Sequence, residues 1–161
     1  MNLVSECEKL REIPLFRDLD TAKCKLIAMS SDRLHYQAGD VVFDEGDPSD
    51  AVYFMLSGRI RVSRELKGRQ IDLAELTGGA VLGETGVICG RSRSASVVAV
   101  EETTMLRTDA NVFNELLYQV PQVTVALARE LANRVDATSD RLLAMTDEGN
   151  EPDRTCLLYT S

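Results

Sequence analysis

The sequence predicts an α+β domain that is mainly β, an eight-stranded, jelly-roll-like double-sheet β-roll with N-terminal helices and a long C-terminal helix. Between residues 33 and 109, short apolar runs alternate with glycine-containing turns, a spacing typical of barrels and double-sheet rolls. Amphipathic segments lie on either side of this region. The 161 residues fit one domain, which we assign to residues 1–146.

The first helices are predicted before residue 30. Residues 3–16 place apolar side chains among charges, which predicts a short amphipathic helix followed by a turn at Pro14. Asp20 and Thr21 precede residues 22–29 and suit the N-terminal cap of a second helix.

The predicted strands lie between turn sequences. Residues 51–56 are apolar throughout and indicate a buried strand, whereas residues 59–62 alternate and indicate a strand with one buried face. Residues 67–69 are typical of a hairpin tip. The predicted strand segments are residues 34–36, 41–43, 51–56, 59–62, 71–76, 96–100 and 104–108.

Two helices are predicted after the strands. Asp109 suits the cap of a helix over residues 110–118, and Pro121 suits the first turn of a long helix that ends near Thr146. Apolar side chains recur along the long helix at steps of three and four, close to a heptad seam. This stripe comprises Leu127, Leu131, Val135, Leu142 and Met145, with Thr138 on the same face.

The stripe has two interpretations. Packing against the chain's own roll would account for it without a partner. Because it extends beyond a roll of this size, we expect a homodimer through the C-terminal helix. Residues 147–161 begin with a polar stop and then lose any period, so we expect a disordered or non-native tail there.

Composition narrows the function. The formal net charge of −8, with scattered basic residues, argues against nucleic acid as a direct partner of this chain. It leaves room for a small anionic ligand held by one arginine. Neither a membrane-spanning run nor a signal peptide is recognisable, so we expect a cytoplasmic protein without a membrane partner.

The sequence offers little for catalysis or metal binding. The four cysteines are far apart and no histidine is near them in sequence, which favours reduced structural thiols over a zinc site. A metal-dependent enzyme on a similar roll needs several histidines, and the chain has only His35, which we expect on a strand. We therefore expect no enzymatic activity, no catalytic residues, no metal and no cofactor.

Residues 82–97 carry the most informative chemistry. Gly83 allows close approach of a backbone amide, and residues 84–88 can form a single helical turn. Arg93 supplies a cationic fork for phosphate, and Glu84 an acceptor for a sugar hydroxyl. From residue types alone, an ordinary loop with an exposed Glu84–Arg93 ion pair is an open alternative.

The pattern Gly83-Glu84-x-Gly86, followed by Arg93-Ser94-Ala95-x-Val97, resembles the phosphate-binding cassette of cyclic nucleotide-binding domains. The resemblance covers about residues 10–146 and extends to residues 45–47, 57–58 and the flanking helices. At Gly86, eukaryotic members usually have alanine, and the chain there resembles bacterial regulators of the catabolite activator type.

The resemblance implies roles for individual residues. Glu84 would bind the ribose 2′-hydroxyl, and Arg93 would pair with the cyclic phosphate. Ile60 and Leu73 would form apolar walls of the pocket. The residues implied to hold sugar and phosphate are Gly83, Glu84, Thr85, Arg93, Ser94 and Ala95.

A second, narrower resemblance lies in residues 134–141, which are similar to the central helix of the catabolite activator-type regulators. It implies that Thr138 and Ser139 meet the adenine amino group, the serine from the opposite subunit, and that Arg134 is a partner for Glu84 or the phosphate. Alternatively, Thr138 and Ser139 simply lie on a solvated helix face. The resemblance favours cAMP over cGMP.

The predicted function is a non-catalytic sensor module that binds a cyclic mononucleotide and signals through movement of its C-terminal helix. The alternative is a truncated sensor half of a catabolite activator-type transcription regulator, whose DNA-binding domain is missing from this chain. The sequence does not identify the downstream effector.

Overall fold

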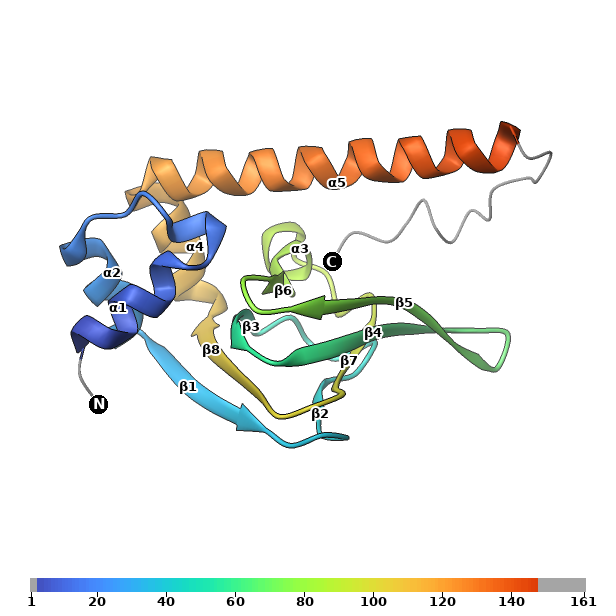
Figure 1. Ribbon diagram of the computed structural model, residues 1–161, viewed down its shortest axis with the longest axis horizontal. Coiled ribbons are helices and arrows are strands. Elements are labelled where there is room, and N and C mark those ends of the chain that lie inside the picture. Colours follow the sequence, from blue (N-terminus) through green and yellow to red (C-terminus); the bar gives the residue numbers. More distant parts are fainter. Residues whose placement is uncertain (1–2, 148–161) are drawn as a thin grey trace.

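The computed structural model describes residues 3–147, and within this range it confirms the predicted two-sheet roll with flanking helices (Figure 1). The strands are β1 (Ser31–Tyr36), β2 (Val41–Phe43), β3 (Ala51–Ser57), β4 (Arg59–Leu66), β5 (Arg69–Thr77), β6 (Val81–Leu82), β7 (Ser96–Ala99) and β8 (Thr103–Asp109). They form two sheets with strand orders β1-β8-β3-β6 and β2-β7-β4-β5, in which all strand pairs are antiparallel.

Strand β6 was not among the segments expected from the sequence. It has two residues, Val81 and Leu82, which pair with Phe54 and Tyr53 of β3. Two residues give no alternation to recognise. The strand matters because it leads directly into the helix that follows Gly83.

Helices α1 (Leu3–Arg11), α2 (Thr21–Met29) and α4 (Ala110–Gln119) gather at one end of the roll, whereas α5 (Pro121–Asp147) runs along the molecule past α3 (Glu84–Cys89) (Figure 1). Asp20 caps α2, since its side chain accepts a hydrogen bond from the Lys23 amide at 2.8 Å. Pro14 begins a separate 3-10 turn, η1 (Pro14–Phe16).

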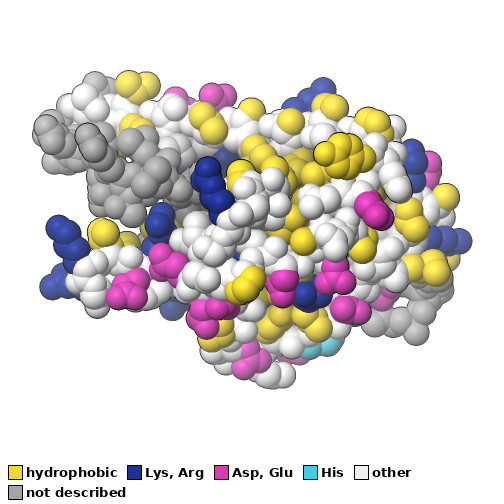
Figure 2. Space-filling view, turned by 180° about the vertical axis from the view of Figure 1, so that it is seen from behind, with side chains coloured by type: hydrophobic (Ala, Val, Ile, Leu, Met, Phe, Trp, Pro, Cys, Tyr) yellow, Lys and Arg dark blue, Asp and Glu magenta, His cyan; other side chains and the backbone are white. Residues whose placement is uncertain are grey.

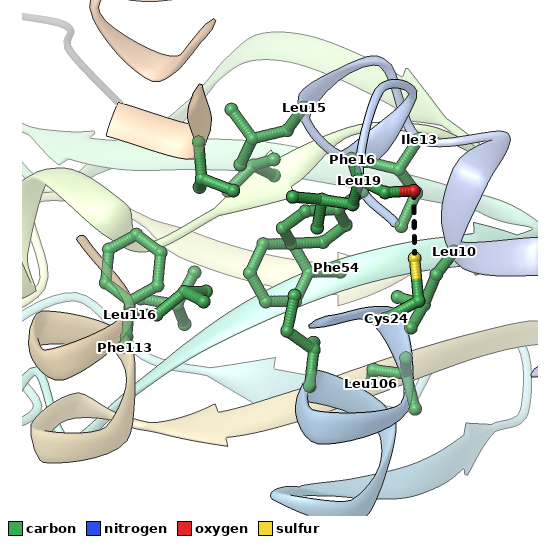
Figure 3. Packing of buried hydrophobic residues seen from close by; sticks show 14 of the residues in the cluster. Leu10, Ile13, Leu15, Phe16, Leu19, Cys24, Phe54, Leu106, Phe113 and Leu116 are labelled. Carbon is green, nitrogen blue, oxygen red and sulfur yellow. Dashed lines mark hydrogen bonds between the residues drawn. The ribbon is translucent and has the colours of Figure 1, made fainter. Parts of the chain in front are cut away.

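A first hydrophobic core joins these helices to sheet strand β3. Phe54 of β3 lies between Phe16, at 4.8 Å between ring centroids, and Phe113 of α4, at 6.2 Å (Figure 3). All three side chains are fully buried, and each such burial stabilises the fold by roughly 1.5–3 kcal/mol. The buried Cys24 thiol donates to the Leu19 carbonyl in the same cluster.

A second core fills the space between the two sheets. It contains Phe43, Tyr53, Ile60 and Met105, one residue from each of four strands. Two of its residues, Phe43 and Tyr53, lie against the guanidinium of Arg93 in the candidate site.

The predicted capping role of Asp109 is wrong. Asp109 occupies the N-cap position of α4, but its side chain makes no capping hydrogen bond. Its carboxylate accepts from Arg107 Nη1 at 2.7 Å instead. The amide of Ala110 donates to the Asp50 carbonyl, so the start of α4 is fastened by backbone rather than by a side-chain cap.

The fully buried apolar side chains of α5 lie in its first part. Val123 and Leu127 are buried and Leu131 packs against the first core. Farther along the stripe, Val135 is 65% exposed, whereas Leu142 and Met145 are half-buried. The stripe predicted from the sequence is therefore partly satisfied within one chain and continues beyond it.

Acidic and basic side chains are interspersed over the face seen in Figure 2. Within residues 3–147, no helix combines the length and apolarity of a membrane span.

The described cysteines differ in exposure. Cys7 and Cys24 are buried, and Cys89 is exposed at the end of α3. Cys156 and the predicted tail after residue 147 lie outside the described residues.

Candidate functional site

The entry into α3 depends on Gly83. Its φ of +79° lies in the left-handed region that favours glycine. A Cβ at this position would overlap Nη1 of Arg93. Gly83 therefore lets the chain turn from β6 into α3 and lets the arginine pass directly beneath the turn.

Arg93 is held inside the roll and is only 3% exposed. Its Nη1 donates to the Gly83 carbonyl at 3.0 Å, and its Nη2 donates to the Ala51 carbonyl at 2.6 Å. The guanidinium lies over the Phe43 ring, 4.3 Å from the centroid, and 5.8 Å from that of Tyr53. Burial lowers its pKa from the ordinary value, and the Nε atom has no hydrogen-bond partner among the described residues.

Glu84, the first residue of α3, is fully buried. Its Oε1 accepts from Arg134 Nη1 of α5 at 2.5 Å, while its Oε2 is buried without a hydrogen-bond partner in the described part of the chain. Burial raises the pKa of Glu84, and the charge of Arg134 opposes that rise. Arg134 also donates from Nη2 to Glu130, one helical turn earlier, at 3.1 Å.

These contacts exclude the exposed Glu84–Arg93 ion pair that the residue types had left open. Both side chains are buried and each has its own partners. Glu84 pairs with Arg134, and Arg93 bonds to carbonyl oxygens.

The two residues expected to meet a base lie differently. Thr138 is half-buried, and its hydroxyl donates to the Arg134 carbonyl at 2.9 Å. Ser139 is exposed. The resemblance assigns the serine to the opposite subunit of a dimer.

Three of the remaining expected residues lie in the apolar cluster between the sheets. Ile60 of β4 is fully buried and Leu73 of β5 is half-buried; both belong to the cluster between the sheets, together with Ala95. Ser94 and Thr85 are half-buried. The structure thus brings Gly83 to Arg93, Glu84 to Arg134, and the three apolar residues into one cluster.

The sequence did not indicate the aromatic stacking under Arg93. Phe43 and Tyr53 are ordinary strand residues in the sequence, and only the fold brings their rings to the guanidinium. Glu130 was also missed, although its position four residues before Arg134 is a recognisable helical spacing for an ion pair.

The site thus combines a two-sheet roll with a buried arginine and a buried carboxylate, and the carboxylate is paired with Arg134 of α5. Residues 33–119, more than half of the chain, match the model of the cyclic nucleotide-binding domain. The chain belongs to the cyclic nucleotide-binding domain family.

Solved structures agree with this assignment. The catabolite activator protein of Thermus thermophilus is 33% identical, with a TM-score of 0.74 over 83% of this chain and 63% of that chain. The N-terminal domain of a transcriptional regulator from Streptomyces coelicolor is 30% identical, with a TM-score of 0.64 over 82% and 95%. A cAMP-binding acyltransferase from Mycobacterium smegmatis, 24% identical with a TM-score of 0.73 over 84% and 42%, shares the fold.

Some relatives are much longer proteins. The lysophospholipase NTE1 of Chaetomium globosum is 33% identical over 108 residues, which are 66% of this chain and 7% of that protein. An NTE family protein of Mycobacterium bovis is 32% identical over 123 residues, 76% of this chain and 21% of the relative. The chain therefore corresponds to a small part of these proteins.

Proposed function

We propose that this chain is a non-catalytic sensor module that binds a cyclic mononucleotide, cAMP in preference to cGMP, and signals through α5. The observation that carries the proposal is Glu84, whose fully buried carboxylate has one oxygen without a partner among the described residues. Leaving a buried acceptor unsatisfied costs roughly 1–3 kcal/mol. A ribose 2′-hydroxyl donating to Oε2 would remove that cost.

Arg93 is the proposed phosphate partner. It keeps its charge inside the roll, and its two carbonyl contacts use only two of five N–H groups. The buried Nε without a partner supports an additional contact at this side chain. In the proposed complex, Ser94 and the Ala95 amide assist Arg93, Gly83 and Thr85 adjoin the sugar, and Ile60 and Leu73 line the pocket.

Thr138 supports the preference for adenine. Its hydroxyl proton is already donated to the Arg134 carbonyl, so toward a ligand the oxygen can only accept. The 6-position of adenine carries an amino group that donates, whereas guanine carries an accepting oxygen there. A Thr138 hydroxyl whose proton is already donated to the Arg134 carbonyl would therefore favour cAMP over cGMP.

Helix α5 is the proposed output. Arg134 connects it to Glu84, so a sugar bound at Glu84 would bear directly on the helix. Ligand binding shifts a conformational equilibrium only by its differential affinity for the two states. A contact shared between sugar site and helix provides such a difference.

We also propose a homodimer through the second half of α5. Val135, on the apolar stripe of α5, is 65% exposed and is not covered by the chain itself. A second copy of the helix, related by a two-fold axis, would bury it.

Isothermal titration calorimetry tests the binding proposal. The purified chain is titrated with cAMP and, separately, with cGMP. We expect micromolar-range binding of cAMP and weaker binding of cGMP. An absence of heat with both nucleotides at millimolar concentration would reject the sensor function.

Two larger contexts are open to such a sensor. Similarity to the Thermus thermophilus catabolite activator protein favours the sensor half of a transcription regulator. Similarity to lysophospholipase NTE1 favours a regulatory domain attached to a hydrolase. The coding DNA beyond the last codon distinguishes them: a helix-turn-helix in frame selects the regulator, and a hydrolase domain selects the enzyme.

A further inference from the structure

Arg93, Asp50, Arg107 and Asp109 form a row of ion pairs with alternating charge, which ends at the start of α4. Asp50 Oδ1 lies 3.5 Å from Arg93 Nη2, and Asp50 Oδ2 lies 3.4 Å from Arg107 Nη2. Arg107 Nη1 in turn lies 2.7 Å from Asp109 Oδ1. Two arginines therefore share one carboxylate, and one of them is the arginine proposed to meet the phosphate.

The backbone fixes this arrangement. Asp50 directly precedes β3, and Arg107 lies on β8, the neighbouring strand, opposite Tyr53. Arg107 and Asp109 are two residues apart on one strand, so their side chains lie on the same face. Ala51, the next residue after Asp50, accepts the hydrogen bond from Arg93.

Asp50 presents an electrostatic problem for an anion site. A phosphate bound to Arg93 would lie close to the Asp50 carboxylate, and like charges at such a separation repel each other. Arg93 is nearly inaccessible to water, whereas the Asp50 side chain is largely exposed, so solvent and salt screen this repulsion in part. The Arg107 guanidinium, on the other oxygen of Asp50, supplies the compensating positive charge.

We propose that Arg107 is a positioning residue for the anion site. It neutralises the Asp50 carboxylate and holds it away from the ligand, so that the Arg93 guanidinium can donate hydrogen bonds to phosphate. This inference rests on the proposed binding of a cyclic nucleotide. Arg107 acts through Asp50 and does not itself touch the ligand. Asp109 keeps the Arg107 guanidinium in place through its own hydrogen bond.

A purely structural role is a weaker account of the same contacts. The Asp50 side chain is 65% exposed, and ion pairs with such exposed partners contribute little to folding stability. We therefore expect the loss of Arg107 to affect anion binding at Arg93 more than folding.

A double-mutant cycle on the full chain tests the proposal. Calorimetry measures the Kd for cAMP in the wild type, R107Q, D50N and the R107Q/D50N double variant, at low salt and at about 0.5 M salt. At low salt, R107Q should weaken binding about fivefold. R107K, which keeps the charge, should stay within about twofold of the wild type, and D50N should restore binding in the R107Q background.

The salt series separates electrostatics from a structural defect. The loss caused by R107Q should shrink at high salt, because the repulsion from Asp50 is then screened. R33Q is the matched control, since it removes the same charge from another partly buried ion pair, with Glu6 at 3.6 Å. Its affinity should equal that of the wild type.

The outcomes are distinct. If the wild type binds neither cAMP nor cGMP, the proposed function fails and this inference fails with it. If the wild type binds cAMP and R107Q binds equally well, only the role of Arg107 is rejected. A loss in R107Q that D50N does not restore, or that persists unchanged at high salt, also rejects it.

Discussion

The Arg134 guanidinium of α5 lies 2.5 Å from the Glu84 carboxylate, although fifty positions separate the two residues in the chain. Glu84 is the first residue of α3, and Arg134 lies near the middle of α5. The contact joins the long helix to the turn between β6 and α3. A ligand at the Glu84 carboxylate would therefore lie next to a side chain of α5.

The first prediction concerns pH. Burial raises the pKa of Glu84 above its ordinary value of 4.5, so the folded chain binds this proton more tightly than the unfolded chain. The associated stability is present at acid pH and is lost as pH rises through the folded-state pKa. Urea unfolding across pH should show the wild type losing stability relative to Glu84→Gln as pH rises from about 4 toward neutrality. Parallel pH profiles for the two proteins would contradict this.

Arg93→Ala should impair both binding and folding. The change removes a charge-assisted phosphate contact, which should cost more than about 2 kcal/mol of cAMP binding. It also leaves the Gly83 and Ala51 carbonyls without their donor, so the melting temperature should fall as well. Calorimetry and thermal unfolding measure the two effects. Unchanged melting would show that the carbonyl contacts contribute nothing to the fold.

Gly83→Ala should be far more damaging than Gly90→Ala. Both glycines have positive φ, +79° and +65°, so both substitutions strain the backbone, at roughly 1 kcal/mol. At Gly83 the new Cβ would also overlap Arg93, whereas at Gly90 it meets open space. We expect Gly90→Ala to retain cAMP affinity and Gly83→Ala to lose it. Equal affinities in the two variants would rule out the steric argument.

Thr138→Val should reduce the preference for cAMP over cGMP. Valine keeps the shape but removes one acceptor, which corresponds to roughly three- to tenfold in affinity for cAMP. Thr146→Val is the matched control, because Thr146 makes the same bond to the carbonyl four residues earlier. Competition binding with both nucleotides gives the ratio. A ratio that Thr138→Val leaves untouched would assign base selection elsewhere.

Val135→Glu should produce a monomer if α5 forms the proposed dimer. A charge at the centre of an apolar helix seam is strongly unfavourable. Val125→Glu changes an exposed valine near the start of the same helix, where one chain packs on its own body, and should leave the dimer intact. Light scattering at high concentration measures the mass. A monomeric wild type would reject the dimer outright.

The elements that the sequence predicted well are those with a local cause. Asp20 caps α2 through a bond within three residues, and Pro121 begins α5 as expected. Period-2 alternation identified β4, whose buried Ile60 and Val62 alternate with the exposed Arg59 and Arg61. Each of these signals depends on neighbours in sequence.

The misses have a non-local cause. Asp109 has the right residue type for a cap, but its carboxylate accepts a hydrogen bond from Arg107 instead of from an amide of α4. The rings of Phe43 and Tyr53 reach Arg93 only because β2 and β3 line one interior. Likewise, the burial of Glu84 could not be predicted from the neighbouring sequence, because its partner Arg134 lies on α5, fifty residues away.

The unequal burial of the thiols has a practical consequence. Cys7 and Cys24 are enclosed in the first core, whereas Cys89 is open at the end of α3, five residues after Glu84. In a chain carrying Cys156→Ser, a maleimide fluorophore would attach at Cys89. The native sequence thus supplies a labelling point beside the cassette, from which fluorescence could follow the arrival of a nucleotide in real time.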